Sequence, residues 1–187
     1  MRPTLGHLLL AAILLAPSAA LAGLRVESGV AKPDIRFKAN GEPGALDIDA
    51  RTNDCTVTDD GTTLTFTVPL SNIKTGIDLR DEHMRDKFLQ VGTYPNATLA
   101  LAKANIAWPT ELGKHAEGTL DADFTAHGAT KAVKVKYDVS KTKQGWKAKA
   151  SFTYNTTDHG IAVPNYLGIS VDALQQASAV VYLVDAP

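Results

Sequence analysis

Few residues of this 187-residue chain are typical of a reactive site. The sequence contains no G-x-S-x-G, C-x-x-C or H-E-x-x-H motif and no glycine-rich loop of the kind that cradles phosphate. Three basic side chains stand close together instead, Arg80, His83 and Arg85. Guanidinium groups bind phosphate well, so these residues could meet a polar or phosphorylated headgroup. Alternatively, they form exposed ion pairs with the acidic residues between them, or anchor a helix to a rim.

The histidines give little support for a catalytic or metal centre. His83, His127 and His159 are not at metal-ligand spacing along the chain, although folding could bring them together. Asp158 and His159 are adjacent, and adjacent side chains of an extended chain point to opposite sides, which favours a loop feature over an acid–base pair. We therefore predict no catalytic residue, no metal site and no cofactor.

The basic trio lies in the one stretch where the chain changes its hydrophobic period. Residues 63–68 alternate between threonine and apolar side chains, which is typical of a strand. Further on, Ile77, Met84 and Phe88 recur at helical spacing among charged residues. Asp78 could cap the amides of the first turn. We predict a short amphipathic helix with Met84 and Phe88 pointing inward, which either plugs a core or closes one end of a cavity.

Most of the remaining sequence alternates like the strands of an antiparallel sheet. Apolar residues occupy every second position of segments such as 118–127, 130–139 and 146–154, and polar or charged residues occupy many positions between them. About eight such segments follow one another at hairpin spacing. A sheet with one apolar face must bury it, either against a second sheet or by closing on itself. The predicted class is all-β, and periodicity does not choose between a sandwich and a barrel.

The expected inward face mixes large side chains with many alanines. These could interdigitate as an ordinary core, or the alanines could leave volume that a guest must fill, because close-packed interiors tolerate few voids. The residues that we predict to line such a cavity are Phe66, Val68, Met84, Phe88, Leu120, Phe124, Val135, Trp146, Phe152 and Tyr154.

Three blocks of the sequence resemble the YceI-like family. The first is T-G-I-x-L-R-D-x-H-M-R-x-K-F-L at residues 75–89 with Y-P-x-A-T-L at residues 94–99; the others span residues 118–133 and 158–161. The resemblance covers about residues 34–185. It implies an antiparallel lipocalin-like barrel of about eight strands, closed at one end by the short helix and holding a long isoprenoid chain. Thr156 and His159 depart from the family, which often has Arg and an aromatic residue there, so no headgroup contact is transferred to Thr156.

The amino-terminal residues have the pattern of a secretory signal. Arg2 precedes an apolar run at residues 8–15, and small residues then lead to Ala20-Leu21-Ala22. We predict a signal peptide at residues 1–22 and one YceI-like domain at residues 23–187, exported to the periplasm as the resemblance implies. The apolar run is too short to span a bilayer, so we expect no stable membrane insertion.

Composition narrows the partners further. The formal net charge is -1 and no basic stripe is present, which argues against a nucleic-acid partner. Cys55 is the single cysteine, so it cannot form an internal disulfide, and we expect a small, at least half-buried side chain. A homodimer is one assembly that the sequence allows.

We predict an exported carrier or sequestering protein that binds a long polyisoprenoid, a prenyl quinone or an isoprenoid precursor, in an apolar barrel cavity. Each buried methylene contributes roughly 0.8 kcal/mol, so such a site needs shape and apolarity more than a special residue. One alternative is a stress-related periplasmic interaction protein with a packed barrel. Another is a lipid- or amide-modifying enzyme that uses His83 or His159 as a base.

Overall fold

The computed structural model describes residues 23–27, 29, 31–42, 46–166 and 169–186. The predicted signal peptide at residues 1–22 lies outside these described residues. Within them, the chain forms one antiparallel sheet of twelve strands. Eight of the strands have seven or more residues, which agrees with the number predicted from the alternating segments.

The strands follow the alternating pattern of the sequence closely. Their bounds are β1 (Leu24–Val26), β2 (Asp34–Glu42), β3 (Leu46–Thr52), β4 (Thr56–Asp59), β5 (Thr63–Pro69), β6 (Asn96–Ala102), β7 (His115–Ala126), β8 (Ala129–Lys141), β9 (Trp146–Asn155), β10 (Asn165–Tyr166), β11 (Ile169–Val171) and β12 (Leu174–Asp185).

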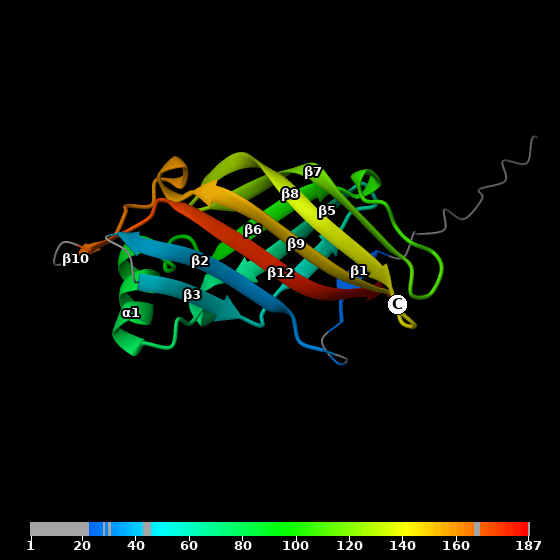
Figure 1. The fold of residues 1–187 in the computed structure, drawn as a ribbon, viewed down its shortest axis with the longest axis horizontal. Coiled ribbons are helices and arrows are strands. Elements are labelled where there is room, and N and C mark those ends of the chain that lie inside the picture. Colours follow the sequence, from blue (N-terminus) through cyan, green and yellow to red (C-terminus); the bar gives the residue numbers. More distant parts are fainter. Residues whose placement is uncertain (1–22, 28, 30, 43–45, 167–168, 187) are drawn as a thin grey trace, which may run out of the picture.

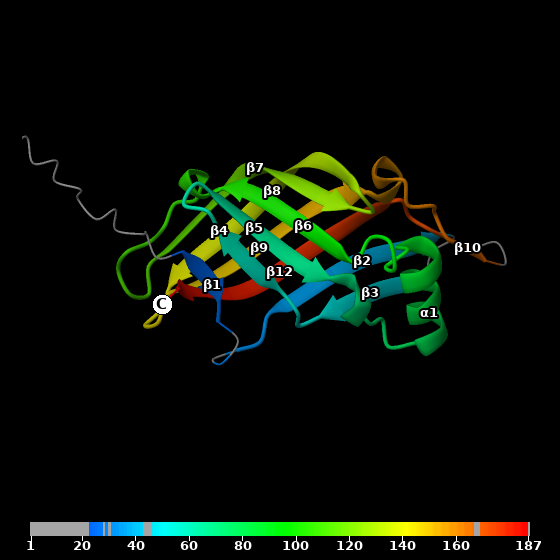
Figure 2. The same cartoon turned by 180° about the vertical axis from the view of Figure 1, so that it is seen from behind.

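The strands pair in the order β10-β11-β2-β12-β9-β8-β7-β6-β5-β4, while β3 pairs with β2 and β1 with β12. This single sheet is strongly curled into a half-barrel, and β4, β5 and β6 lie across from β2 and β12 (Figures 1 and 2). The predicted antiparallel, lipocalin-like fold is confirmed, and a sandwich of two separate sheets is excluded because all twelve described strands belong to one hydrogen-bonded sheet.

Two sets of contacts draw the edges of the curled sheet together. Arg51 of β3 forms a pair of backbone hydrogen bonds with Lys74, beyond the end of β5, at 2.8 and 2.9 Å. At the other end, the buried carboxylate of Asp59 in β4 accepts a hydrogen bond from the Leu24 amide of β1 at 2.9 Å and pairs with Lys103 at 2.6 Å. These contacts limit the exposed edges that an open sheet would present.

The predicted helix is present and interrupts the sheet where the hydrophobic period changes. It comprises α1 (Asp78–His83) and a π-helical segment, η2 (Met84–Phe88), in which the Leu89 amide donates to the Met84 carbonyl oxygen at 2.9 Å. It lies at one end of the long axis, and the C-terminus lies at the other (Figure 1). None of the helices in the described part of the chain is long and apolar enough to cross a bilayer.

The predicted cap of this helix is wrong. Ile77 occupies the N-cap position and makes no side-chain hydrogen bond, while Asp78 is already the first helical residue and lies exposed to solvent. Asp81 satisfies the preceding backbone instead, because its buried carboxylate accepts a hydrogen bond from the Thr75 amide at 2.7 Å. The three remaining short turns are 3-10 helices, η1 (Leu70–Asn72), η3 (Lys103–Asn105) and η4 (Thr156–His159).

The concave side of the sheet is packed at some positions and open at others. Leu64 and Leu24, which are 0% and 6% exposed, line no opening and lie in a packed part of the core. Phe66 and Phe152 point to the same interior but are only half-buried. Inward-facing aromatic side chains that retain accessible surface indicate unfilled space, because a close-packed interior would cover them.

Candidate ligand-binding cavity

The curled sheet encloses apolar space in two adjoining compartments. The outer cavity lies beneath the helix and has a volume of about 650 Å³. The inner cavity lies deeper in the sheet and has a volume of about 100 Å³. Phe37, Ala97 and Phe124 line both of them, so these three residues form the junction between the two compartments.

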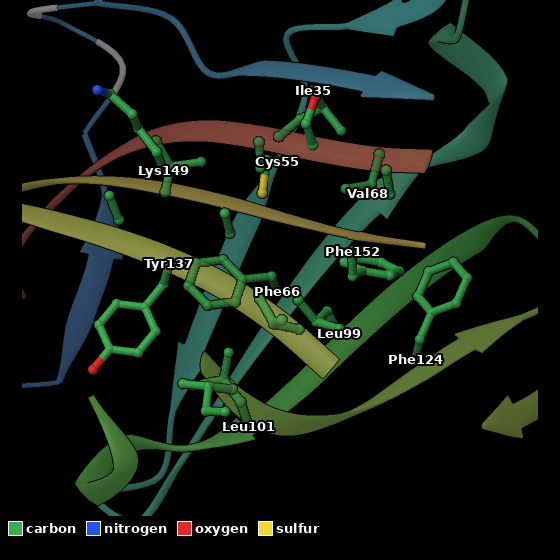
Figure 3. A pocket seen from close by; sticks show the side chains of 18 of the residues that line it. Ile35, Cys55, Phe66, Val68, Leu99, Leu101, Phe124, Tyr137, Lys149 and Phe152 are labelled. Atoms are coloured by element: carbon green, nitrogen blue, oxygen red, sulfur yellow. The ribbon is translucent and has the colours of Figure 1, made fainter. Parts of the chain in front are cut away.

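The inner cavity is walled by aliphatic and aromatic side chains. Phe66 of β5, Leu99 of β6, Tyr137 of β8 and Phe152 of β9 approach it from different strands (Figure 3). Few polar groups are present on this wall. The cavity can therefore accept hydrocarbon, whose burial is favourable, and offers little to a polar group that would lose its hydration there.

The outer cavity has an apolar floor and a more polar mouth. Met84 and Phe88 of the helical segment line it together with Tyr154 of β9 and Gln175 of β12. The Tyr154 hydroxyl donates a hydrogen bond to Gln175 Oε1 at 2.9 Å. Burial raises the pKa of Tyr154 well above its usual value, so this phenol stays neutral and remains a donor.

Nine of the ten predicted lining residues contact one or both cavities. Phe66, Val68, Leu120, Phe124, Val135 and Phe152 line the inner cavity, and Met84, Phe88, Phe124 and Tyr154 line the outer cavity. The strand alternation and the helical spacing placed these side chains on the inward face.

Trp146 is the exception and lines neither cavity. Its ring packs edge-on against Trp108 with 5.3 Å between ring centroids, and its indole N–H donates to the Pro109 carbonyl oxygen at 3.0 Å. Lys141 lies over the same ring. The expectation failed because the loop between β6 and β7 folds over this end of the sheet, and it is Trp108 from that loop that lines the inner cavity.

The predicted basic rim is only partly present. Arg80 and His83 line the outer cavity, whereas Arg85 does not. Lys87 takes part in the lining instead, and sequence reasoning did not select it. Lys87 follows Arg80 by seven residues and His83 by four, and residues three or four apart share one side of a helix. This spacing could have predicted that Lys87 lies on the same side of the helix as Arg80 and His83.

Arg80 is held in place by a short relay of hydrogen bonds. Its Nε donates to Thr75 Oγ1 at 2.7 Å, and its Nη2 donates to the Thr75 carbonyl oxygen at 3.0 Å. The Thr75 hydroxyl donates in turn to the Asp81 carboxylate at 2.5 Å. Among the described residues, no ion pair forms between Arg80 or Arg85 and the acidic residues of the helix, so Arg80 anchors the helix to the segment before it.

The electrostatics of Asp81 follow from this relay. Asp81 is 3% exposed, and its burial acts to raise the pKa of the carboxyl. The two hydrogen bonds from Thr75 and the charges of Arg85 and Arg80 together outweigh burial, so the pKa of Asp81 falls below its usual value. The carboxylate is therefore ionised at neutral pH and keeps the relay intact.

Cys55 lies in the wall of the inner cavity and is half-buried, as predicted. Removal of water from the thiol raises the pKa of Cys55 to about 12. The side chain is consequently a neutral, weakly nucleophilic thiol at physiological pH.

Among the described residues, no group of three or more His, Cys, Asp or Glu side chains could hold a metal ion. His127 and His159 lie together, since His127 Nδ1 is 3.2 Å from the His159 carbonyl oxygen and His159 Nδ1 is 2.9 Å from the Ala129 carbonyl oxygen. His83 remains on the helix, at the mouth of the outer cavity. Both rings lie against backbone carbonyls, the half-buried His127 and the buried His159, and they tie the η4 turn to the β7–β8 hairpin.

A curled antiparallel sheet around an apolar cavity, with a helix at one end, places this chain among the lipocalin-like half-barrels. The model of the YceI-like domain matches residues 26–180, so the chain belongs to the YceI-like family. The resemblance stated from the three sequence blocks is confirmed. No curated protein matches this sequence.

Solved structures with this fold come from several bacteria. A polyisoprenoid binding domain from Saccharophagus degradans, implicated in plant cell wall breakdown, aligns with a TM-score of 0.70 at 14% identity, over 89% of this chain and 99% of that chain. Burkholderia cenocepacia BcnA aligns with a TM-score of 0.59 at 11% identity, over 80% and 96%. The Campylobacter jejuni YceI protein aligns with a TM-score of 0.50 at 16% identity, over 76% and 87%. At such identities the likeness establishes the fold.

Proposed function

We propose that this protein is an exported carrier that sequesters a long polyisoprenoid in the joined cavities. The single observation that carries the proposal is the shape and chemistry of the enclosed space. About 650 Å³ of largely apolar volume lies next to a second apolar compartment, and Phe37, Ala97 and Phe124 line both. A long, narrow, flexible hydrocarbon fits two compartments in series, whereas a compact ligand would fit only the outer one.

The energetics of such a ligand agree with the wall chemistry. Each buried methylene contributes roughly 0.8 kcal/mol, so several isoprene units offset the freedom lost on binding without many polar contacts. The Saccharophagus degradans domain of the same fold is described as binding a polyisoprenoid, which supports a ligand of this class here. The enclosed volume also favours a carrier over an interaction protein with a packed barrel.

The side chains near the cavity favour a carrier over an enzyme. A lipid-modifying enzyme needs a base or nucleophile at the ligand. Of the two candidate bases, His159 is 1% exposed and bound through Nδ1 to a backbone carbonyl. His83 does line the outer cavity, but no carboxylate stands among the described lining residues to orient it as a base. Cys55, the single cysteine of the sequence, lines the inner cavity, and its thiol is neutral at physiological pH. We therefore assign the cavity a storage or transport role, with the protein in the periplasm.

The proposal is tested by purifying the protein from its host, extracting it with organic solvent and identifying the lipid by mass spectrometry. A polyprenyl compound in near-stoichiometric amount is expected. The delipidated protein should then take up an added prenyl lipid. Failure to recover any lipid, together with failure to take one up, would refute the proposal.

Export is tested separately. The full chain is expressed, the cell is fractionated, and the intact mass of the protein is measured. Cleavage before Gly23 and recovery in the periplasmic fraction are expected. An uncleaved chain that stays in the cytoplasm would contradict the predicted location without affecting the cavity.

A further inference from the structure

Large apolar side chains are exposed mainly at one end of the molecule. Among the described residues, the exposed large hydrophobic side chains are Ile77, Leu79, Leu112, Val163 and Leu174. Of these five, Leu112 alone belongs to the loop between η3 and β7, which reaches the end of the long axis opposite to the helix (Figure 1). The other four belong to segments around the outer cavity. Single exposed leucines need no explanation, but a cluster of apolar side chains marks an interaction surface.

These four side chains lie around the mouth of the outer cavity. Ile77 and Leu79, at the start of the helix, line the cavity themselves. Val163 and Leu174 each directly precede a residue that lines it. The helix α1, the strand β10 and the beginning of β12 lie at the same end of the molecule (Figures 1 and 2). The mouth of the cavity therefore has an apolar rim that is exposed to solvent.

Basic side chains accompany this apolar rim. Among the described residues that line the outer cavity, Arg80, His83 and Lys87 are basic, and no aspartate or glutamate is present. Leu79, His83 and Lys87 follow one another every four residues and are all exposed, so they share one side of the helical segment. That side of the segment presents apolar and basic groups together at the mouth.

The acids of the helical segment lie away from the mouth or inside the fold. Asp78, Glu82 and Asp86 also follow one another every four residues, but they do not line the cavity. Asp81 is buried and accepts a hydrogen bond from the Thr75 amide. A surface that meets the mouth would therefore contact the apolar and basic side chains, with the exposed acids of the helix on its other side.

From these observations we infer that the mouth end of the protein docks reversibly on the surface of an anionic phospholipid bilayer. Ile77, Leu79 and Leu174 enter the interfacial region, and the basic side chains lie among the anionic lipids. Such binding grows with the apolar area that is inserted and with attraction to anionic lipids. The inference rests on the proposed function, because docking brings the mouth of the carrier against the bilayer, where a lipid can pass between the two without crossing water.

A second copy of the chain is a less favoured partner for this surface. Two mouths placed face to face would bring Arg80, His83 and Lys87 of one copy close to the same basic residues of the other. Opposed charges of like sign weaken an interface. An anionic bilayer instead complements both the apolar rim and the sign of the charges beside it.

Vesicle sedimentation tests the docking. The protein purified from its host is mixed with vesicles of equal parts phosphatidylglycerol and phosphatidylcholine, or with vesicles of phosphatidylcholine alone. We expect binding to the anionic vesicles to be at least about tenfold tighter, because several basic side chains meet the anionic surface. The difference should shrink as salt is added. Equal binding to both kinds of vesicle, or binding to neither, would overturn the inference.

A matched pair of double variants connects the docking to the mouth. Leu79→Ala with Lys87→Gln should weaken binding to the anionic vesicles by about tenfold or more. The control, Leu112→Ala with Lys143→Gln, removes an equally exposed leucine and an exposed lysine beyond the other end of the sheet and should bind like the wild type. Circular dichroism establishes that both variants fold. The same affinity in both would overturn the inference.

The two tryptophans of the sequence report which end docks. Trp108 and Trp146 pack against each other, and Trp146 begins β9 at the end opposite to the helix. Lipids brominated on their acyl chains quench tryptophan fluorescence on contact. The bound wild-type protein should keep its emission, whereas the residue added by Leu79→Trp should be quenched. Quenching of the native pair, without quenching at position 79, would indicate docking by the opposite end and would overturn the inference.

The outcomes separate the docking from the carrier function beneath it. Recovery of a prenyl lipid from a protein that does not bind vesicles would overturn the docking and leave the carrier in place. Vesicle binding that depends on Leu79 and Lys87 would support the docking even where the cavity takes up no lipid. A dimer that binds no vesicles, and that Leu79→Ala with Lys87→Gln dissociates in light scattering, would show that a second copy covers this end and would overturn the inference.

Discussion

One small residue and two large ones line both cavities. Ala97 of β6 is 4% exposed and lies with Phe37 and Phe124 between the compartments. Phe124 also packs edge-on against Phe152, with 5.0 Å between ring centroids, so its ring has little room to move aside. The side chain at position 97 is therefore expected to set the width of the passage.

Ala97→Leu should obstruct this passage and shorten the chain that the protein can accept. Affinity for a long prenyl lipid should fall by about tenfold or more, since several methylenes lose their apolar site, while a short prenyl lipid should bind as before. Isothermal titration with lipids of increasing length measures the effect. The control is Ala100→Leu, also in β6 but outside both cavity walls. An unchanged length dependence in Ala97→Leu would contradict the two-compartment account.

Cys55 offers a chemical probe of the inner cavity. Because burial raises the pKa of Cys55 to about 12, only roughly one thiol in ten thousand is ionised at about pH 8. Alkylation by iodoacetamide should be at least about 100-fold slower than for free cysteine, and its rate should rise about tenfold for each pH unit. A bound lipid should slow it further. Reaction as fast as that of free cysteine would contradict the assigned environment.

At the scale of the element, the helix depends on a buried acid within its first turn. Asp81 is 3% exposed and binds Thr75 through the amide and the hydroxyl, while Thr75 binds Arg80. Asp78, at the start of the same helix, is exposed and makes no cap. The attachment of the helix over the outer cavity is thus assigned to one carboxylate rather than to the exposed charges of the segment.

Asp81→Ala should lower the free energy of unfolding by about 1–3 kcal/mol, because the Thr75 amide loses its partner. Asp78→Ala should change it by less than about 0.5 kcal/mol. Urea denaturation followed by circular dichroism compares the two. Similar losses in both variants would indicate that Asp81 has no special role.

The same carboxylate makes stability depend on pH. The pKa of Asp81 is lowered in the folded state, so its contribution is complete at neutral pH and is lost as the pH falls below the ordinary value of 3.8 toward the folded pKa. The wild-type protein should therefore lose more stability between neutral pH and about pH 3 than Asp81→Ala does. Equal losses would mean that the relay does not protect the ionised form.

For the whole molecule, the cavity leaves part of the interior without packing partners, and a ligand can supply them. A lipid that binds only the folded state stabilises it by about 2.7 kcal/mol at a hundredfold excess over Kd. For a domain of this size, that free energy corresponds to a rise in Tm of about 5–10 °C. Differential scanning calorimetry with and without a prenyl lipid measures it. No shift at saturating lipid would argue against binding inside the fold.

Much of the half-barrel was predictable because strand alternation and helical period act locally. The inward positions of Phe66, Phe124 and Phe152 followed from period two, and those of Met84 and Phe88 from the helix. Phe37 was available from the same alternation but was not selected. Trp108 had no comparable signal, because a loop residue enters the cavity only through the path of its loop.

The amino-acid order alone established an all-β chain with one amphipathic helix, a wet and an apolar side to each long strand, and membership of the YceI-like family. Only the tertiary structure decided that one sheet curls on itself, that Ala97, Phe37 and Phe124 line both cavities, and that Lys87 rather than Arg85 lines the outer one. The physical reason is the distance along the chain over which each signal acts. Periodicity reports which way a side chain points from its own strand or helix, whereas a cavity is the volume left between side chains distant in sequence, and its size depends on how all of them pack.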